Sequence, residues 1–366
     1  MTGAAALLLL ALGRTAPDTL PVSDPGWTLQ AGVTRTEYLG RPAFRAGTGR
    51  AFHRAARLED GTIDVDVALN GKRSFVYLQY RMATDDEHEE IYLRPHKSGL
   101  PDAVQYAPVF RGESAWQLYH REGHTAEVEL ETGRWVRVRL VLSGRQAALF
   151  VGDTTRPVMV VPRMARDPVA GYLALRGFVP QGSRATEAAY FSNVVVRPGF
   201  IPFRFAPVPA PAALAGVVSS WELSESFVAD TGTIMALPSL EGRRWTSATA
   251  DPDGLVVVNR FLSRPGQARR STTVARIRVE AATAETRALA LGFSDEMTVF
   301  LNGRPVAAAR APYSYNFPRQ EGLIGLEQQT VFLPLVAGAN EVAVALTDGF
   351  GGWGIMGRWM PSAGRR

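Results

Sequence analysis

The chain has 366 residues, of which 46% are hydrophobic, so it is long enough for two or three domains with full cores. It has no cysteine, which excludes thiol catalysis, disulfides, iron–sulfur clusters and cysteine-ligated zinc. The formal net charge is +5 and the pI is about 9.7, but the basic residues are interleaved with acidic ones and do not cluster. A nucleic-acid partner is therefore not predicted.

The N-terminal segment predicts export. Residues 4–13 form an apolar run that is too short to span a bilayer but has the length of a signal-peptide core. Residues 1–3 carry no positive charge, so either the true start lies upstream or the segment is an apolar terminus. We predict a signal peptide and N-terminal tail over 1–20, a secreted or periplasmic bacterial protein, and no transmembrane segment.

The first half of the chain alternates short patterned segments with turn signals such as Asp60-Gly61 and Asn70-Gly71. A period of two in apolar side chains over 62–69 and 134–140 predicts half-buried strands. We predict an antiparallel sandwich over 21–198, without a helix of useful length. Its further strands are expected at 74–82, 87–94, 115–120, 146–151, 157–161, 171–176 and 190–197.

Residues 199–216 are rich in proline and predict a semi-rigid linker. A second sandwich is predicted over 217–366, and residues 280–286 are expected to form a loop although Ala and Glu favour a helix there. The expected fold class is all-β, with two antiparallel β-sandwich (jelly-roll) domains in tandem. The strands of the second domain are expected at 219–228, 254–261, 272–280, 287–293, 296–302, 329–335 and 340–347.

Several segments of the first half carry a family resemblance. They are LEDGTIDVDV (58–67), GRWVRVRLVL (133–142), AALFVGD (147–153) and FSNVVV (191–196). Together they resemble the concanavalin A-like (laminin G-like) lectin and glucanase domain. YLRPHKSG (92–99), PDAVQY (101–106) and WQLY (116–119) resemble a subgroup of uncharacterised exported bacterial members.

The second half carries ALALG (288–292), TVFLNGRPV (298–306) and VFLPLVAGANEV (331–342). These segments resemble the galactose-binding-like jelly roll that is appended to glycosidases. The two resemblances imply a pair of β-sandwiches and a role in carbohydrate recognition, and many modules of the second kind are structural.

One sheet face of the first domain concentrates polar and aromatic side chains. On two predicted strands, Val76 and Leu78, and then Ile91 and Leu93, alternate with side chains that point the other way. Because the aliphatic residues belong in the core, we expect the others to face solvent as a ligand-binding surface. The predicted ligand-binding residues are Tyr77, Gln79, Arg81, His88, Glu90, Tyr92, Arg94, His96, Gln117 and Tyr119.

Such a face suits a polysaccharide, including an anionic one. Tyrosine rings offer flat apolar surfaces with a hydroxyl, and Arg and Glu side chains form paired hydrogen bonds with neighbouring ligand groups. The alternative is an ordinary solvated face crossed by ion pairs. All histidines of the chain lie in this domain, and His88 and His96 are interpreted as hydrogen-bonded surface residues rather than metal ligands.

A hydrolytic site is a second hypothesis. The glucanases that the first domain resembles use carboxylates at i, i+2 and i+4 of one strand. Asp85, Glu87 and Glu89 have this spacing, but Asp86 and His88 fill gaps that are apolar in the family, so we interpret the segment as an acidic loop entering a strand. The weak catalytic candidates that remain are Glu90, Asp102 and Glu113.

Other motifs predict no cofactor. The glycines at 349–354 lack a following helix and a phosphate-binding lysine, and residues 251–254 indicate a turn. Calcium stays open but unassigned, as does the oligomeric state. The first hypothesis is an exported carbohydrate-binding protein, non-catalytic or accessory. The alternatives are a glycoside hydrolase or polysaccharide lyase, and a structural envelope protein without a ligand.

Overall fold

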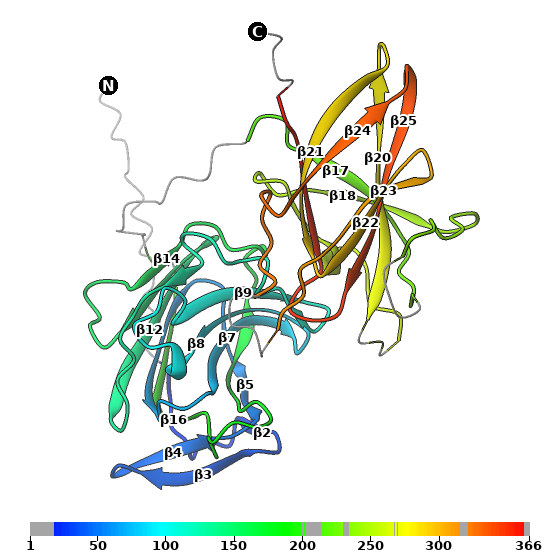
Figure 1. The fold of residues 1–366 in the computed structure, drawn as a ribbon. Coiled ribbons are helices and arrows are strands. Elements are labelled where there is room, and N and C mark those ends of the chain that lie inside the picture. The colour runs from blue at the N-terminus through cyan, green and yellow to red at the C-terminus, as the bar shows by residue number, and fades with distance from the viewer. Residues whose placement is uncertain are drawn as a thin grey trace, which may run out of the picture.

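The computed structural model describes residues 18–199, 201, 214–229, 234–266, 268, 270–314 and 321–361. Within these ranges the chain forms β-strands and two short 3-10 helices, η1 (Pro95–Lys97) and η2 (Val258–Arg260), with no α-helix. The strands build two β-sandwiches that lie side by side (Figure 1). The predicted all-β class is confirmed. In the part of the chain that the structure describes, no helix has the length and apolar character needed to cross a bilayer.

The first sandwich consists of sheets A and B, which enclose a core that includes Val65, Leu78, Ile91 and Phe191. Sheet A has the order β14 (Met159–Val161), β13 (Gln146–Val151), β12 (Trp135–Ser143), β6 (Gly61–Leu69), β16 (Ala189–Pro198), β4 (Arg41–Ala46) and β3 (Val33–Tyr38), with β1 (Asp18–Leu20) paired to β16. Sheet B has the order β10 (Glu113–Ser114), β9 (Val104–Phe110), β8 (Glu87–Leu93), β7 (Phe75–Thr84), β15 (Gly171–Phe178), β5 (Gly49–Leu58) and β2 (Trp27–Leu29), with β11 (Thr125–Ala126) paired to β9.

The second sandwich consists of sheets C and D around a core that includes Trp221, Leu291, Val299 and Trp353. Sheet C has the order β19 (Leu255–Val257), β26 (Gly354–Trp359), β21 (Glu285–Ser294) and β24 (Gln329–Leu335). Sheet D has the order β18 (Trp245–Thr249), β17 (Ser220–Ser224), β20 (Ser271–Ala281), β25 (Gly338–Asp348), β22 (Glu296–Leu301) and β23 (Arg304–Arg310).

One predicted strand, at 115–120, is wrong. This segment is a turn in which the Leu118 amide donates to the Ala115 carbonyl. The Gln117 amide instead donates to the carbonyl of Gly351 in the second sandwich, and the Gln117 carbonyl accepts from the amide of Ile324. The backbone groups of Gln117 are therefore satisfied by hydrogen bonds to the neighbouring sandwich and not by a strand of sheet B.

The two segments predicted to flank the first sandwich, at 1–20 and 199–216, are only partly described by the structure. Residues 1–17 lie outside the described ranges, whereas residues 18–20 form β1 and belong to sheet A rather than to an N-terminal tail. Most of the predicted linker at 199–216 also lies outside the described residues. Sheets A and B together span residues 18–198, and sheets C and D span residues 220–359.

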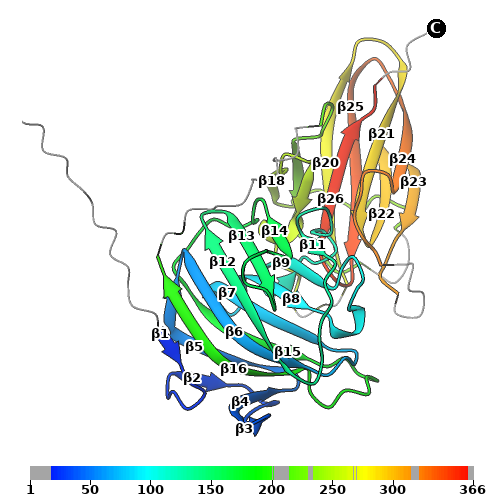
Figure 2. The same cartoon turned by 90° about the vertical axis from the view of Figure 1, so that its left-hand side faces the viewer.

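The two sandwiches share a continuous apolar interface. Leu255, Val257 and Met356 of the second sandwich pack into the core of the first. Fully buried Gln117 donates through Nε2 to the Glu321 carbonyl at 2.9 Å. Figure 2 shows the second sandwich on the β9 side of sheet B, so its loops border the outer face of that sheet.

Candidate functional site

The outer face of sheet B, which points away from sheet A, carries the predicted cluster. Val76, Leu78, Ile91 and Leu93 are fully buried in the core between the sheets. The side chains between them lie together on the other face, because β7 and β8 pair Tyr77 with Tyr92 and Gln79 with Glu90. The alternation in the sequence therefore places the two faces as expected.

These side chains are nevertheless buried, which corrects the prediction of a solvated face. His88 and Glu90 are fully buried, and Tyr92 is 3% exposed. The segment after β9 folds over them: Ser114 Oγ donates to Glu90 Oε1 at 2.8 Å, and Gln105 Nε2 donates to the carbonyls of Trp116 and Tyr119, both at 2.7 Å. The predicted residues consequently form a layer beneath the surface.

Gln79, His88 and Glu90 form a buried polar network. Gln79 Nε2 donates to Glu90 Oε2 at 2.8 Å and lies 2.9 Å from His88 Nε2. Burial alone would raise the pKa of Glu90, but hydrogen bonds with His88 and Gln79 and the charge of Arg176 lower it to about 2. Glu90 is therefore ionised at neutral pH.

Two arginines lie above this network. Arg176 on β15 and Arg50 on β5 are directly paired across the strands, and both are partly exposed. The Arg176 guanidinium stacks 4.5 Å from the ring centre of Tyr77. Burial first and the neighbouring Arg176 second lower the pKa of Arg50, against the opposing charges of Glu90, Asp85 and Asp86. Two like charges are therefore held side by side.

Sequence reasoning missed both arginines. In β15 the residues Leu173 and Leu175 belong to the core, so Arg176 has the parity of the outer face. The alternation applied to β7 and β8 would have identified Arg176. It would not have identified Arg50, because β5 carries consecutive buried residues and does not alternate regularly.

Aromatic rings continue the face on either side of the arginines. Phe178 and Phe75 lie 5.9 Å apart between ring centres, and both are half-buried beside Tyr77 and Tyr92. Trp116 packs on the same cluster and leads into the second sandwich through Tyr313 at 5.6 Å and Phe350 at 6.1 Å. An aromatic band therefore runs from sheet B to the loops of the neighbouring sandwich.

Arg81 does not lie on this face, contrary to its predicted place. It has a left-handed backbone with φ of 49° in a bulge of β7, and it is 2% exposed. Its guanidinium donates to the Glu59 carbonyl at 2.6 Å and to Asp60 Oδ1 at 2.9 Å, so it fixes the loop before β6. The bulge shifts the alternation by one residue, a change that periodicity alone does not reveal.

Gln117 and Tyr119 also lie elsewhere than predicted. Both are buried in the junction between the sandwiches, where the Tyr119 hydroxyl accepts from Arg260 at 2.6 Å. Arg94 stays near the face but is 4% exposed, and it donates to Gln105 Oε1 at 2.6 Å. His96 lies on η1 against Phe75, where burial and nearby cations, Arg94 first, lower its pKa to about 4.

The three candidate catalytic carboxylates are each held by other groups. Asp102 pairs with Arg94 at 3.0 Å and contacts Lys97; burial would raise its pKa, but these two cations lower it. Glu113 pairs with Arg264 at 3.1 Å, and the pKa of Glu90 is about 2. A general acid needs a raised pKa, so neither Glu90 nor Asp102 is suited to that role.

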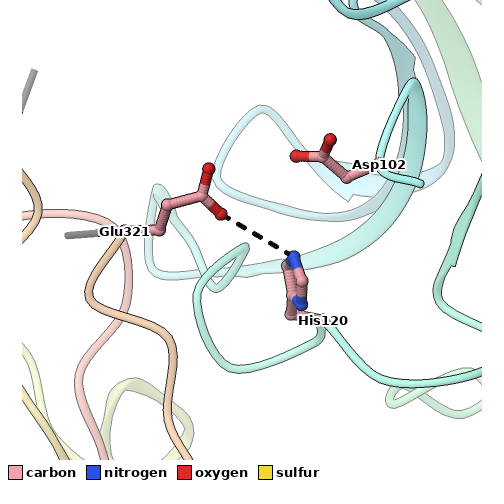
Figure 3. A group of neighbouring side chains, drawn as sticks. All are labelled: Asp102, His120 and Glu321. Atoms are coloured by element: carbon pink, nitrogen blue, oxygen red, sulfur yellow. Dashed lines mark ion pairs between the residues drawn. The ribbon is translucent and has the colours of Figure 1, made fainter. Parts of the chain in front are cut away.

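A carboxylate–histidine group lies at the junction of the sandwiches. Asp102, His120 and Glu321 place one ligand atom each within 4.8 Å of one another (Figure 3). The Lys97 ammonium contacts Asp102 and lies 3.1 Å from Glu321. Lys97 therefore already supplies the positive charge between the two carboxylates. Burial also lowers the pKa of His120. The group fits an ionic link between the domains and does not fit a metal centre.

We expect EDTA to leave the melting temperature unchanged, and Ca²⁺ or Zn²⁺ not to raise it, because Lys97 occupies the position of a cation. The variant Lys97→Met should lose about 1–3 kcal/mol of unfolding free energy, since it leaves Asp102 and Glu321 without that partner. Differential scanning calorimetry with and without metal measures both effects. A rise of several degrees on adding Ca²⁺ to the wild type would contradict this interpretation.

Comparisons with known proteins give structural matches of limited extent. No family model matches the sequence, and no curated protein matches it. Three similar solved structures are the carbohydrate-binding module CBM66 from Bacillus subtilis (17% identity, 47% of this chain, 95% of that chain, TM-score 0.35), a Bacillus licheniformis β-glucanase (12%, 50%, 98%, 0.36) and the exoplasmic/lumenal domain of VIP36 bound to Ca²⁺ and Man3GlcNAc (13%, 49%, 86%, 0.34). We draw no functional conclusion from similarity at this level.

Proposed function

We propose that the outer face of sheet B binds an anionic polysaccharide, and that the protein is an exported carbohydrate-binding protein with a non-catalytic or accessory role. The observation that carries this proposal is the pair Arg50 and Arg176, which stand together, partly exposed, beside the rings of Tyr77 and Phe178. A sugar carboxylate or sulfate has at least two acceptor oxygens and can therefore accept hydrogen bonds from both guanidinium groups. The half-buried rings of Phe75 and Phe178 offer stacking surfaces for the sugar.

The contrast with sheet A supports this interpretation. On sheet A, Asp64 pairs with Arg139 at 2.7 Å, and Asp66 pairs with Arg41 at 2.8 Å and Arg137 at 2.6 Å. This is the charge-paired, solvated face that the alternative hypothesis expects. On sheet B, neither arginine of the pair forms an ion pair within 4.0 Å in the described part of the chain.

The buried layer supports the arginine pair from below. Glu90 supplies an opposite charge that offsets the repulsion between Arg50 and Arg176. The Nε atom of Arg50 is buried and finds no hydrogen-bond partner among the described residues. The exposed part of the Arg50 guanidinium group is the part that an anionic ligand can reach.

Hydrolysis has less support than binding. Among the described carboxylates of sheet B, Glu89 has a pKa raised to about 7, as a general acid requires, because burial outweighs its hydrogen bonds with Tyr106 and the Arg166 amide. Glu89, however, is 1% exposed on the core side of β8, where Tyr106 donates to it at 2.5 Å. A substrate on the outer face would not reach this carboxyl group.

We expect Arg50→Ala and Arg176→Ala each to weaken binding to polygalacturonate or alginate roughly 10-fold to 150-fold, because each removes a charge-assisted hydrogen bond of about 1.5–3 kcal/mol. Affinity electrophoresis in gels containing the polysaccharide measures the effect, and added salt should reduce the retention of the wild type. Arg134→Ala is the matched control, since Arg134 is an exposed arginine that pairs with Glu131. Equal retention of the wild type and Arg176→Ala would refute the proposed site, as would equal retention by neutral β-glucan.

A further inference from the structure

A cavity lies where the two sandwiches meet. It has a volume of about 480 Å³ and is lined by Arg111 and Glu113 of the first sandwich and by Asn259, Ser263, Arg264 and Phe350 of the second. This volume is within the roughly 300–1,000 Å³ typical of small-molecule sites. Because both sandwiches supply its walls, the cavity exists only in the assembled chain.

Asn259 lines this cavity and carries an unpaired buried donor. Its side chain is 2% exposed, and its Nδ2 atom has no hydrogen-bond partner in the part of the chain that the structure describes. Residue 259 is fixed within η2, whose first amide, that of Val258, donates to the Trp353 carbonyl at 2.8 Å. Buried amide donors are almost always satisfied, so this one indicates a ligand acceptor.

The charges in the cavity favour an anion. The charge of Arg264 is balanced by Glu113 at 3.1 Å, and Arg264 also contacts Asp348, whose pKa is raised by burial to about 8, so that it stays largely uncharged at neutral pH. Arg111 instead donates to two backbone carbonyls, those of Asn259 at 3.1 Å and Arg260 at 3.3 Å, and forms no ion pair with a described residue. These carbonyls orient the guanidinium group without neutralising it, so the cavity keeps a positive charge.

Phe350 supplies an apolar wall. It is 57% exposed and belongs to the aromatic band through Trp116 and Tyr313, with ring centres at 6.1 Å and 5.6 Å. Ser263 and Glu113 add a hydroxyl and a carboxylate to the lining. A cation, an amide donor, a carboxylate acceptor and an aromatic face together match a hydroxyl-rich ring that bears one acidic group.

We propose that this cavity binds a uronic acid residue, as a single acidic sugar or as the end of an acidic chain. Its carboxylate accepts from Arg111, a hydroxyl accepts from Asn259 Nδ2, and the ring lies on Phe350. The choice of an acidic sugar rests on the function proposed for sheet B. The cavity itself is defined by residues that sheet B does not use, so the two sites can be tested separately.

The test uses the full chain with sodium galacturonate and, as the neutral match, galactose, followed by isothermal titration calorimetry and saturation-transfer NMR. We expect the wild type to bind galacturonate and not galactose. Asn259→Asp, which replaces the donor with an anion of the same shape, should weaken binding at least tenfold. Phe350→Ala alters an exposed side chain and should weaken it several-fold without loss of folding.

Arg134→Ala should bind galacturonate as the wild type does, and thermal melts confirm that every variant is folded. Unchanged galacturonate binding in both Asn259→Asp and Phe350→Ala would overturn this inference, as would equal binding of galactose. Polygalacturonate retention that depends on Arg176 would still stand in that case. Loss of galacturonate binding in Asn259→Asp, with retention insensitive to Arg176, would instead support the cavity and refute the proposed face.

Discussion

Replacing Gly171 with alanine is expected to destabilise the protein by about 3 kcal/mol and to disturb the outer face of sheet B. Gly171 begins β15 opposite the bulge of β7, where a Cβ atom would lie 2.2 Å from the Arg81 carbonyl carbon and 2.5 Å from the Met82 amide nitrogen. Both atoms belong to the backbone, so no side-chain rotation can relieve the overlap. Either β15 must move away from β7 or the bulge must change.

The bulge determines which residues face outward. Before it, Leu78 and Tyr80 point into the core, whereas after it Met82 packs against Tyr172 on the outer face. A shifted bulge would therefore disturb the Gln79–Glu90 pair beneath the arginines. Gly171→Ala should unfold at a lower urea concentration than the wild type, and polygalacturonate should retain it less strongly.

The matched control is Gly47→Ala. Its new Cβ would meet only the Gly32 carbonyl at 3.2 Å and the Thr186 carbonyl at 3.8 Å, so we expect a loss below about 1 kcal/mol. A wild-type urea midpoint for Gly171→Ala would show that the bulge accommodates a side chain, contrary to this account.

The sequence was sufficient to assign the faces of β7 and β8 because one face of each strand packs in the core. Val76, Leu78, Ile91 and Leu93 are aliphatic at every second position, and a strand has no other way to bury all of them. Local pattern therefore determined which side chains share a face. It could not determine their exposure, which depends on the distant segment after β9.

The residues that sequence reasoning misplaced depend on contacts from elsewhere in the chain. Gln117 and Tyr119 have strand-like neighbours, but their partners Glu321, Gly351 and Arg260 belong to the second sandwich. No local pattern encodes a contact between two domains. The same reasoning applies to Arg50, because its proposed role depends on its pairing with Arg176, which lies on a strand more than a hundred residues later.

Stability is expected to fall by about 1 kcal/mol between about pH 7 and pH 8, because Asp348 titrates in this range. Asp348 is fully buried beside the junction cavity. Burial, and then the nearby carboxylates of Asp295 and Glu113, outweigh the contact with Arg264 and raise its pKa from 3.8 to about 8.

The sign follows from the protons bound in each state. Above pH 3.8 the unfolded chain has lost the proton that folded Asp348 keeps, so the stability linked to that proton is complete below 3.8 and is lost as the pH rises to about 8. Glu89, with a pKa of about 7, contributes in the same direction at lower pH. His96 and His124, with pKa values lowered to about 4 and about 3, act in the opposite direction only below 6.5.

Asp348→Asn isolates this effect, because an amide of the same shape cannot release a proton. Urea denaturation at a series of pH values should show a falling unfolding free energy for the wild type and a nearly flat one for the variant above about pH 7. Glu113→Gln removes one of the carboxylates that raise the pKa of Asp348, so the fall in its unfolding free energy should end at a lower pH. Parallel curves for the wild type and Asp348→Asn would mean that Asp348 is already ionised at neutral pH, paired with Arg264.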